Sequence, residues 1–268
     1  MSESTDLSAV DEVRRVLSRP LFNPVLKVWV GEGKLDYEVY LRTGELLALQ
    51  TPQAELVAPD ELMFQVVHQA QEIWLKLLAH EFAETVGELD CDALWGVSAR
   101  LERCARITGC LTHELGVLES LTPDTYQIIR RHLGNGSGQE SPGFNAVRVA
   151  AQYVADALDR MLARNGVGLA EVYGDADPAL KRICELLVDV DEGYQTWLFT
   201  HYMLVRRTIG VGRGVEALDG VPTQVLTGRM TQPLFRSLWA VRNDLTAGWQ
   251  REGGYAPGAE RHETRVSA

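Results

Sequence analysis

Two histidines lie in strongly apolar stretches of this 268-residue sequence, His68 and His201. His201 stands near the centre of Trp197 to Gly210, which reads WLFTHYMLVRRTIG, and a glycine-rich segment follows it. A histidine held between apolar turns is suited to be an axial ligand of haem iron, because neutral imidazole binds iron. The same pattern also describes an imidazole that is only hydrogen-bonded within a core, and spacing alone does not distinguish the two.

Other metal and nucleotide sites are less well supported. His80-Glu81 and His113-Glu114 both lack the second histidine that a HExxH zinc motif places four residues on. The GVGRG run at residues 210–214 has no GK[ST], and it follows an expected helix instead of a strand, which disfavours a phosphate-binding loop.

The cysteines form no metal or redox motif. They occur in neither CxxC nor CxxCH spacing, which argues against a zinc ribbon, a thioredoxin-type site and covalently attached c-type haem. The four are Cys91, Cys104, Cys110 and Cys184.

Composition narrows the function classes further. The net charge of -11 disfavours nucleic acid and anionic membranes as partners, since both would repel the protein. The first residues, MSESTDLSAVDEVRR, lack the apolar centre of a signal peptide, and no apolar run approaches the ~18 residues that span a membrane. We therefore expect a cytoplasmic protein with reduced thiols.

Helical spacing of apolar residues dominates the chain. It predicts long helices over residues 60–85, 94–121, 144–165 and 178–207. A shorter helix is expected to begin at Pro123, with Thr122 as its N-cap. Period-two alternation is absent apart from a short candidate at Val25 to Val30.

Turn chemistry and polar ends set the expected boundaries. The glycines of residues 134–138 and 210–220 predict loops. Residues 1–19 and 250–268 are polar and are expected to be flexible. The prediction is a single all-α domain over residues 20–249.

Arg130 and Arg131 follow the apolar pair Ile128-Ile129 and precede the first glycine loop. Cations at a helix C-terminus interact favourably with the helix dipole, which explains them without any function. A guanidinium fork aimed at a substrate carboxylate is the alternative. Their position by itself favours the first explanation.

Four segments, read in order, resemble the tryptophan 2,3-dioxygenase superfamily of haem enzymes. The resemblance covers roughly Tyr37 to Arg242, and the segments read YEVYLRTGELLALQ, DELMFQVVHQAQEIWLKLLAHE, RLERCARITGCLTHELGVLESLTPDTYQIIRRHLGNGSGQESPGF and DEGYQTWLFTHYMLVRRTIG. The resemblance implies an all-α fold of the tryptophan 2,3-dioxygenase type, haem b as cofactor and O2 as co-substrate.

The resemblance assigns roles to the two histidines. His201 matches the proximal histidine that binds haem iron and leaves the opposite face open for O2. His68 matches the distal histidine that faces the bound indole and hydrogen-bonds its ring nitrogen. Phe64 lies one helical turn before His68, so both rings project to the same side.

The same resemblance implies further substrate contacts. Arg130 matches the arginine that pairs with the substrate carboxylate, and Ser137 and Gly138 match the loop over the haem. Residues that reach into a neighbouring subunit's active site in the family match Tyr37, Tyr40 and Leu41. The family forms homotetramers, and we expect the same here.

Two loops depart from the family pattern. Val215 replaces a threonine whose hydroxyl helps to hold the substrate's ammonium and carboxylate, so that hydrogen bond cannot form. Glu216 and Asp219 follow where the family has small residues, and they either bind an ammonium or are solvated. In the first glycine loop, Asn135 and Gln139 replace a proline and a phenylalanine.

The resulting prediction is a haem-dependent oxygenase that inserts oxygen from O2 at the C2–C3 edge of an indole. The altered loops favour a tryptophan-derived or substituted indole and insertion of a single oxygen atom. One alternative is a true tryptophan 2,3-dioxygenase that forms N-formylkynurenine. The other is a non-catalytic haem or indole sensor.

Overall fold

A computed structural model describes residues 9–17, 35–174, 177–212, 214–249 and 258. Within these ranges the chain is helix and loop, with a lone antiparallel bridge between Glu216 and Pro222 in place of any strand. The all-α prediction is therefore confirmed. The strand candidate at Val25 to Val30 lies outside the described residues.

The chain forms two compact units, Met1–Pro52 and Gln53–Ala268. In the first unit the described helices are α1 (Ala9–Leu17), α3 (Asp36–Leu41) and α4 (Thr43–Leu46). α1 falls inside the segment expected to be a flexible end. The boundary expected at residue 249 coincides with the end of the continuously described chain, and it stays a prediction.

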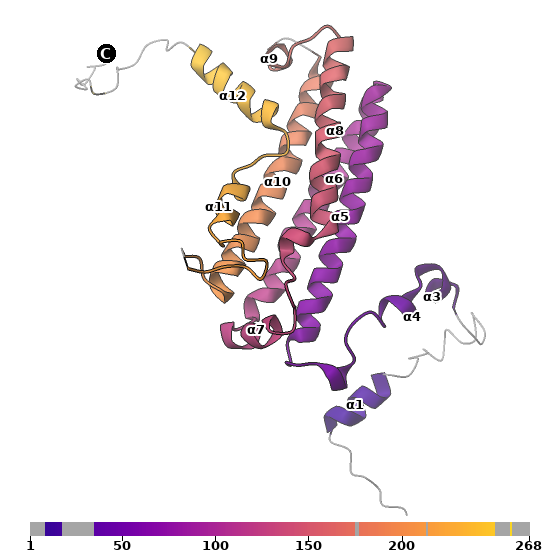
Figure 1. Cartoon of the computed structure of the whole chain (residues 1–268). Coiled ribbons are helices and arrows are strands. Elements are labelled where there is room, and N and C mark those ends of the chain that lie inside the picture. The colour runs from indigo at the N-terminus through magenta and orange to yellow at the C-terminus, as the bar shows by residue number, and fades with distance from the viewer. Residues whose placement is uncertain (1–8, 18–34, 175–176, 213, 250–257, 259–268) are drawn as a thin grey trace, which may run out of the picture. The chain divides into compact units, whose positions relative to one another are not determined.

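Four long helices build the second unit (Figure 1): α5 (Glu61–Asp90), α6 (Leu94–Leu115), α8 (Pro142–Arg164) and α10 (Pro178–Thr208). α5 packs against α6 and α8, and α6 packs against α10. Their apolar stripes form one core that includes Leu78, Leu101, Val154 and Leu187. No helix in the described ranges is long and apolar enough to cross a membrane.

Shorter elements connect and cover these helices. Those before α8 are the 3₁₀ turns η1 (Gln53–Glu55), η2 (Gly116–Ser120) and η3 (Gly138–Glu140) and the helix α7 (Pro123–Arg130). Those after it are α9 (Leu169–Val172), α11 (Val225–Met230) and α12 (Arg236–Gly248).

Two helix boundaries differ from the expected ones: α5 continues past residue 85 to Asp90, and α6 ends early. The helix expected over residues 94–121 ends as an α-helix at Leu115, because Gly116 is a poor helix former and the chain tightens there into η2. α7 begins at Pro123 as expected, but the Thr122 hydroxyl donates to Thr125 Oγ1 at 3.0 Å instead of capping the backbone. In the predicted loop before α8, Gly134 has a φ of +60°, which favours glycine.

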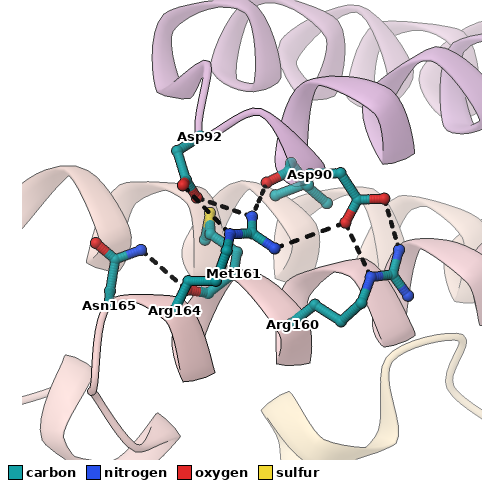
Figure 2. Close-up of polar contacts among 7 residues, drawn as sticks. Asp90, Asp92, Arg160, Met161, Arg164 and Asn165 are labelled. Carbon is teal, nitrogen blue, oxygen red and sulfur yellow. Dashed lines mark hydrogen bonds and ion pairs between the residues drawn. The ribbon is translucent and has the colours of Figure 1, made fainter.

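Ion pairs fasten the far ends of α5 and α8 (Figure 2). Arg160 binds the Asp90 carboxylate with two hydrogen bonds of 2.9 and 2.8 Å. Arg164 binds Asp92 at 2.9 and 3.3 Å and donates to the Leu89 carbonyl at 2.5 Å. Because the C-terminal ends of both helices meet there, α5 and α8 run parallel.

A buried carboxylate joins α5 to α6. Glu81 is 3% exposed and accepts hydrogen bonds from Arg100 at 3.0 Å and Arg103 at 2.6 Å. Burial by itself would raise the pKa of Glu81, but the two guanidinium groups outweigh it and the pKa is lowered.

We expect Glu81→Gln to lower the free energy of unfolding by about 1–2 kcal/mol at pH 7, discounted because both arginines reach solvent. A lowered pKa stabilises the fold above about pH 4.5, and this contribution is lost as the pH falls through the folded-state value. The difference between wild type and variant should therefore shrink in acid. Urea unfolding at pH 7 and pH 4 measures it, with exposed Glu119→Gln as the control. A difference that grows in acid would contradict the assignment.

Candidate active site

Within the second unit, the chain direction brings the predicted site residues to one end of the bundle. Gly143 at the start of α8 donates to Glu72 near the start of α5 at 2.9 Å, whereas the ends of both helices meet at the ion pairs described above. The C-terminal part of α10, which carries His201, returns to the end where α5 begins. α7 lies at this end too (Figure 1).

A hydrogen bond to the backbone determines which ring nitrogen of His68 carries the proton. Its Nδ1 lies 2.7 Å from the carbonyl oxygen of Phe64. Because a carbonyl only accepts, Nδ1 carries the proton and Nε2 of the neutral ring has a free lone pair. Burial lowers the pKa of His68, against opposing effects of the Phe64 carbonyl and the Glu72 carboxylate. The ring is thus neutral at pH 7 and can accept a hydrogen bond from a donor such as an indole N–H.

Aromatic rings surround His68 on one side. The Phe64 ring lies 4.1 Å from the His68 ring, at an angle of 37° between their planes. Tyr126 of α7 lies 6.1 Å from Phe64. Burial raises the pKa of the Tyr126 hydroxyl, opposed by the charge of Arg130. These tilted rings make an aromatic wall of the kind that binds a planar aromatic ligand.

Tyr126 is a site residue that the sequence reasoning missed. It precedes Arg130 by four residues, so both side chains project from the same face of α7. This four-residue spacing could have indicated Tyr126 as a neighbour of Arg130. It is hard to recognise in the sequence because apolar residues such as Ile129 indicate only the core-facing side of this short helix.

His201 has the properties of a metal ligand. Burial is the main reason that its pKa is lowered to about 4, and electrostatic repulsion by His68 contributes less. Within the described chain, no residue hydrogen-bonds the His201 ring. A neutral imidazole without a protein partner is free to coordinate iron.

The glycine loop borders the same imidazole. A Cβ atom built on Gly138 would lie 3.9 Å from His201 Nε2. A larger side chain at this position would crowd the nitrogen that has to bind the metal, so glycine keeps this edge of the ring accessible. The donor type, its protonation state and the small neighbour together fit a haem ligand.

Ser137 holds the loop in shape. Its Oγ accepts from the backbone nitrogen of Gln139 at 3.3 Å, and its own backbone nitrogen donates to the Glu140 carboxylate at 3.4 Å. The Gln139 carbonyl accepts from Asn145 of α8 at 3.1 Å. The Ser137 hydroxyl hydrogen is not needed for this cap, and it can be donated to a ligand.

Arg130 is held by the second divergent loop. Its Nη2 donates to the carbonyl oxygen of Glu216 at 2.7 Å. That loop closes on itself, since the backbone nitrogen and hydroxyl of Thr223 both donate to the Val215 carbonyl, at 3.0 and 3.1 Å. An arginine has five N–H donors, so Arg130 keeps donors for a carboxylate while the loop orients it.

The acidic residues of this loop differ in their contacts. Asp219 accepts from the backbone nitrogen of Val221 at 3.0 Å, which fixes a turn. Both Glu216 and Asp219 are exposed. Glu216 therefore contributes its carbonyl to the contact with Arg130, while its carboxylate faces solvent.

Tyr37, Tyr40 and Leu41 belong to the first compact unit and lie on α3. They are 68%, 87% and 45% exposed, and α3 has no buried residue. Such exposed aromatic and apolar side chains are typical of a surface that another protein surface covers.

Other reactive groups do not compete with this site. Burial raises the pKa of Cys104 and Cys184 to about 12, so neither thiol is a nucleophile at neutral pH. In the described parts of the chain, no cluster of three His, Cys, Asp or Glu residues is arranged to hold a metal ion.

Comparison with known proteins bears on the same residues. Residues 27–150 match the family model described as tryptophan 2,3-dioxygenase. A tryptophan 2,3-dioxygenase of Xanthomonas oryzae pv. oryzae (strain PXO99A) is 32% identical over 80% of this chain and 89% of its own length. That of Kineococcus radiotolerans is 31% identical over 79% and 92%. That of Xanthomonas campestris pv. campestris (strain B100) is 29% identical over 86% and 94%.

Proposed function

Because the chain belongs to the tryptophan 2,3-dioxygenase family of haem- and O2-dependent enzymes, which act on indoles and form tetramers, we propose that it oxygenates the C2–C3 edge of an indole. The substrate we propose is a tryptophan-derived or substituted indole. The observation that carries the proposal is His201, whose ring nitrogen Nε2 borders Gly138 and whose pKa is lowered by burial to about 4.

His201 would hold haem b, which supplies the activation of O2. The protein's own residues would mainly orient the substrate, because the C2–C3 edge is already the electron-rich part of the indole. Neutral His68 accepts the indole N–H at Nε2, and the rings of Phe64 and Tyr126 flank the indole plane. Arg130 binds a substrate carboxylate, and Ser137 donates its hydroxyl nearby.

The closed loop at Val215 supports a substrate other than free tryptophan. The loop has no hydroxyl at this position, and the Val215 carbonyl is occupied by Thr223. The loop therefore orients Arg130 for a carboxylate, but Val215 offers no hydroxyl of its own to an ammonium. A substrate whose amino group is modified or absent fits this arrangement better, and we propose that one oxygen atom is inserted into it.

A second candidate is conversion of tryptophan to N-formylkynurenine with both oxygen atoms. The relatives named above favour it, since all three are called tryptophan 2,3-dioxygenase and align over most of their length.

The family's tetramer suggests a role for α3. We infer that Tyr37, Tyr40 and Leu41 complete the active site of a neighbouring subunit in a homotetramer. Their exposure on a helix without buried residues supports this inference.

The test is product analysis under ¹⁸O-labelled O2, with reductant or peroxide present or absent. Tryptophan, indole-3-propionate, tryptamine and indole form a panel that varies the carboxylate and the ammonium separately. We expect one labelled atom in a hydroxylated or epoxidised product, the second atom leaving as water with two electrons from the reductant. Loss of the carboxylate should impair turnover more than loss of the ammonium.

Two other outcomes would overturn the main proposal. Two labelled atoms in a ring-opened product of tryptophan would establish the dioxygenase. A normal haem spectrum with no indole consumed would favour the non-catalytic sensor.

A further inference from the structure

A buried hydrogen bond connects the two helices that carry the histidines. Trp197 Nε1 of α10 donates to Gln71 Oε1 of α5 at 2.7 Å. Trp197 lies one helical turn before His201, and Gln71 lies three residues after His68. The two side chains are only 8% and 6% exposed. The contact therefore lies within the core, about one helical turn from His201 on α10 and from His68 on α5.

A third helix fixes the amide of Gln71. Its Nε2 donates to the Leu111 carbonyl at 2.9 Å and to the Glu114 carboxylate at 3.2 Å, both on α6. Glu114 also accepts from Trp74 Nε1 at 2.6 Å. An indole nitrogen only donates and a carbonyl only accepts, so the amide has one orientation that satisfies all its partners.

Such a contact restricts movement more sharply than apolar packing does. Leucine and valine side chains tolerate small shifts between helices, because dispersion contacts are non-directional. A buried N–H or amide without its partner is costly, and the cost appears as soon as the geometry is lost. Rotation or sliding of α10 against α5 would break the contact between Trp197 and Gln71.

We propose that Gln71 is a positioning residue, whose amide fixes α10 against α5 and thereby sets the placement of His201 relative to His68. The inference rests on the proposed function, since it concerns how the iron ligand is placed opposite the residue that orients the indole. Gln71 itself does not touch substrate or cofactor in this scheme.

The chain provides a matched control on the same helix. Trp239 Nε1 donates to the buried carboxylate of Asp191 on α10 at 2.9 Å. Asp191 lies ten residues before His201, roughly 15 Å along the helix. Trp239→Phe and Trp197→Phe each remove one indole N–H from a buried acceptor. They differ in whether the lost bond adjoins the two histidines.

The experiment compares wild type, Trp197→Phe and Trp239→Phe, each loaded with haemin. We expect both variants to unfold at lower temperature. Only Trp197→Phe should shift or broaden the iron–histidine stretching band of the ferrous protein, and it should release haemin to apomyoglobin about three- to tenfold faster. Gln71→Met should reproduce these changes, and combining it with Trp197→Phe should add little.

A readout without haem keeps the inference separate from the proposed function. In the haem-free protein, amide hydrogen exchange over residues 197–208 should rise in Trp197→Phe and not in Trp239→Phe. If Trp197→Phe loses stability but retains the wild-type band, haemin release and exchange pattern, Gln71 is only structural. If wild type does not bind haemin through His201 while the exchange result holds, the proposed function fails and the link between α5 and α10 stands.

Discussion

Replacing His201 with alanine is expected to weaken haemin binding more than about 100-fold and to abolish the iron–histidine stretching band. His201 is a half-buried, neutral imidazole of the candidate site, and within the described chain no residue hydrogen-bonds its ring. Added imidazole should restore part of the binding, because the variant leaves space for a free ligand. Haemin titration and resonance Raman spectra of the ferrous protein measure both effects.

The controls for this substitution are two other histidines. His113→Ala removes an exposed imidazole at the same end of the bundle, and it should bind haemin like wild type. His68→Ala should retain the iron–histidine band while weakening indole binding. A His201→Ala protein with an unchanged spectrum and affinity would disprove the ligand assignment.

Asp191→Ala is expected to lower the free energy of unfolding by about 3–5 kcal/mol, more than the other stability variants proposed here. This fully buried carboxylate accepts from the backbone nitrogens of Leu234 and Phe235 at 3.0 and 2.9 Å. It also accepts from Trp239 at 2.9 Å and Gln195 at 3.1 Å. Removing it leaves four donors at this site without their acceptor, and the start of α12 loses its attachment to α10.

Two milder substitutions serve as comparisons for the stability loss of Asp191→Ala. Asp191→Asn retains one acceptor oxygen and should cost about 1–3 kcal/mol. Exposed Asp189→Ala, on the same helix, should change stability by less than about 0.5 kcal/mol. Urea unfolding at fixed pH provides the comparison. A loss for Asp191→Ala no greater than that for Asp189→Ala would show that solvent replaces the carboxylate and that the contacts to α12 are dispensable.

The long helices could be predicted from sequence because their apolar residues recur at three and four positions over five or more turns. Leu101, Cys104 and Ile107 follow this spacing in α6, and all are buried. The end of α6 could not be placed from that pattern. Leu118 is also buried, so the apolar periodicity continues through the 3₁₀ turn that begins at Gly116.

The site could be predicted only in part, because its contacts join residues distant in the chain. Gln71 reads as one polar residue on an apolar helix, yet its partner Trp197 lies 126 positions away. The contact of Arg130 with the Glu216 carbonyl spans 86 positions and involves a backbone atom, which leaves no mark in the sequence. Local patterns indicate which face of a helix is buried, but they do not identify the partner.

The ion pairs at the far end of the bundle bear on how this protein could acquire new substrates. Asp90 lies 22 residues from His68 on α5, roughly 33 Å along the helix. The ion pairs and the candidate active site therefore lie at opposite ends of the same helix bundle. Mutations that reshape the loops around Val215 and Gln139 leave the ion pairs of Arg160 and Arg164 intact. Substrate specificity can therefore change during evolution while the bundle remains folded.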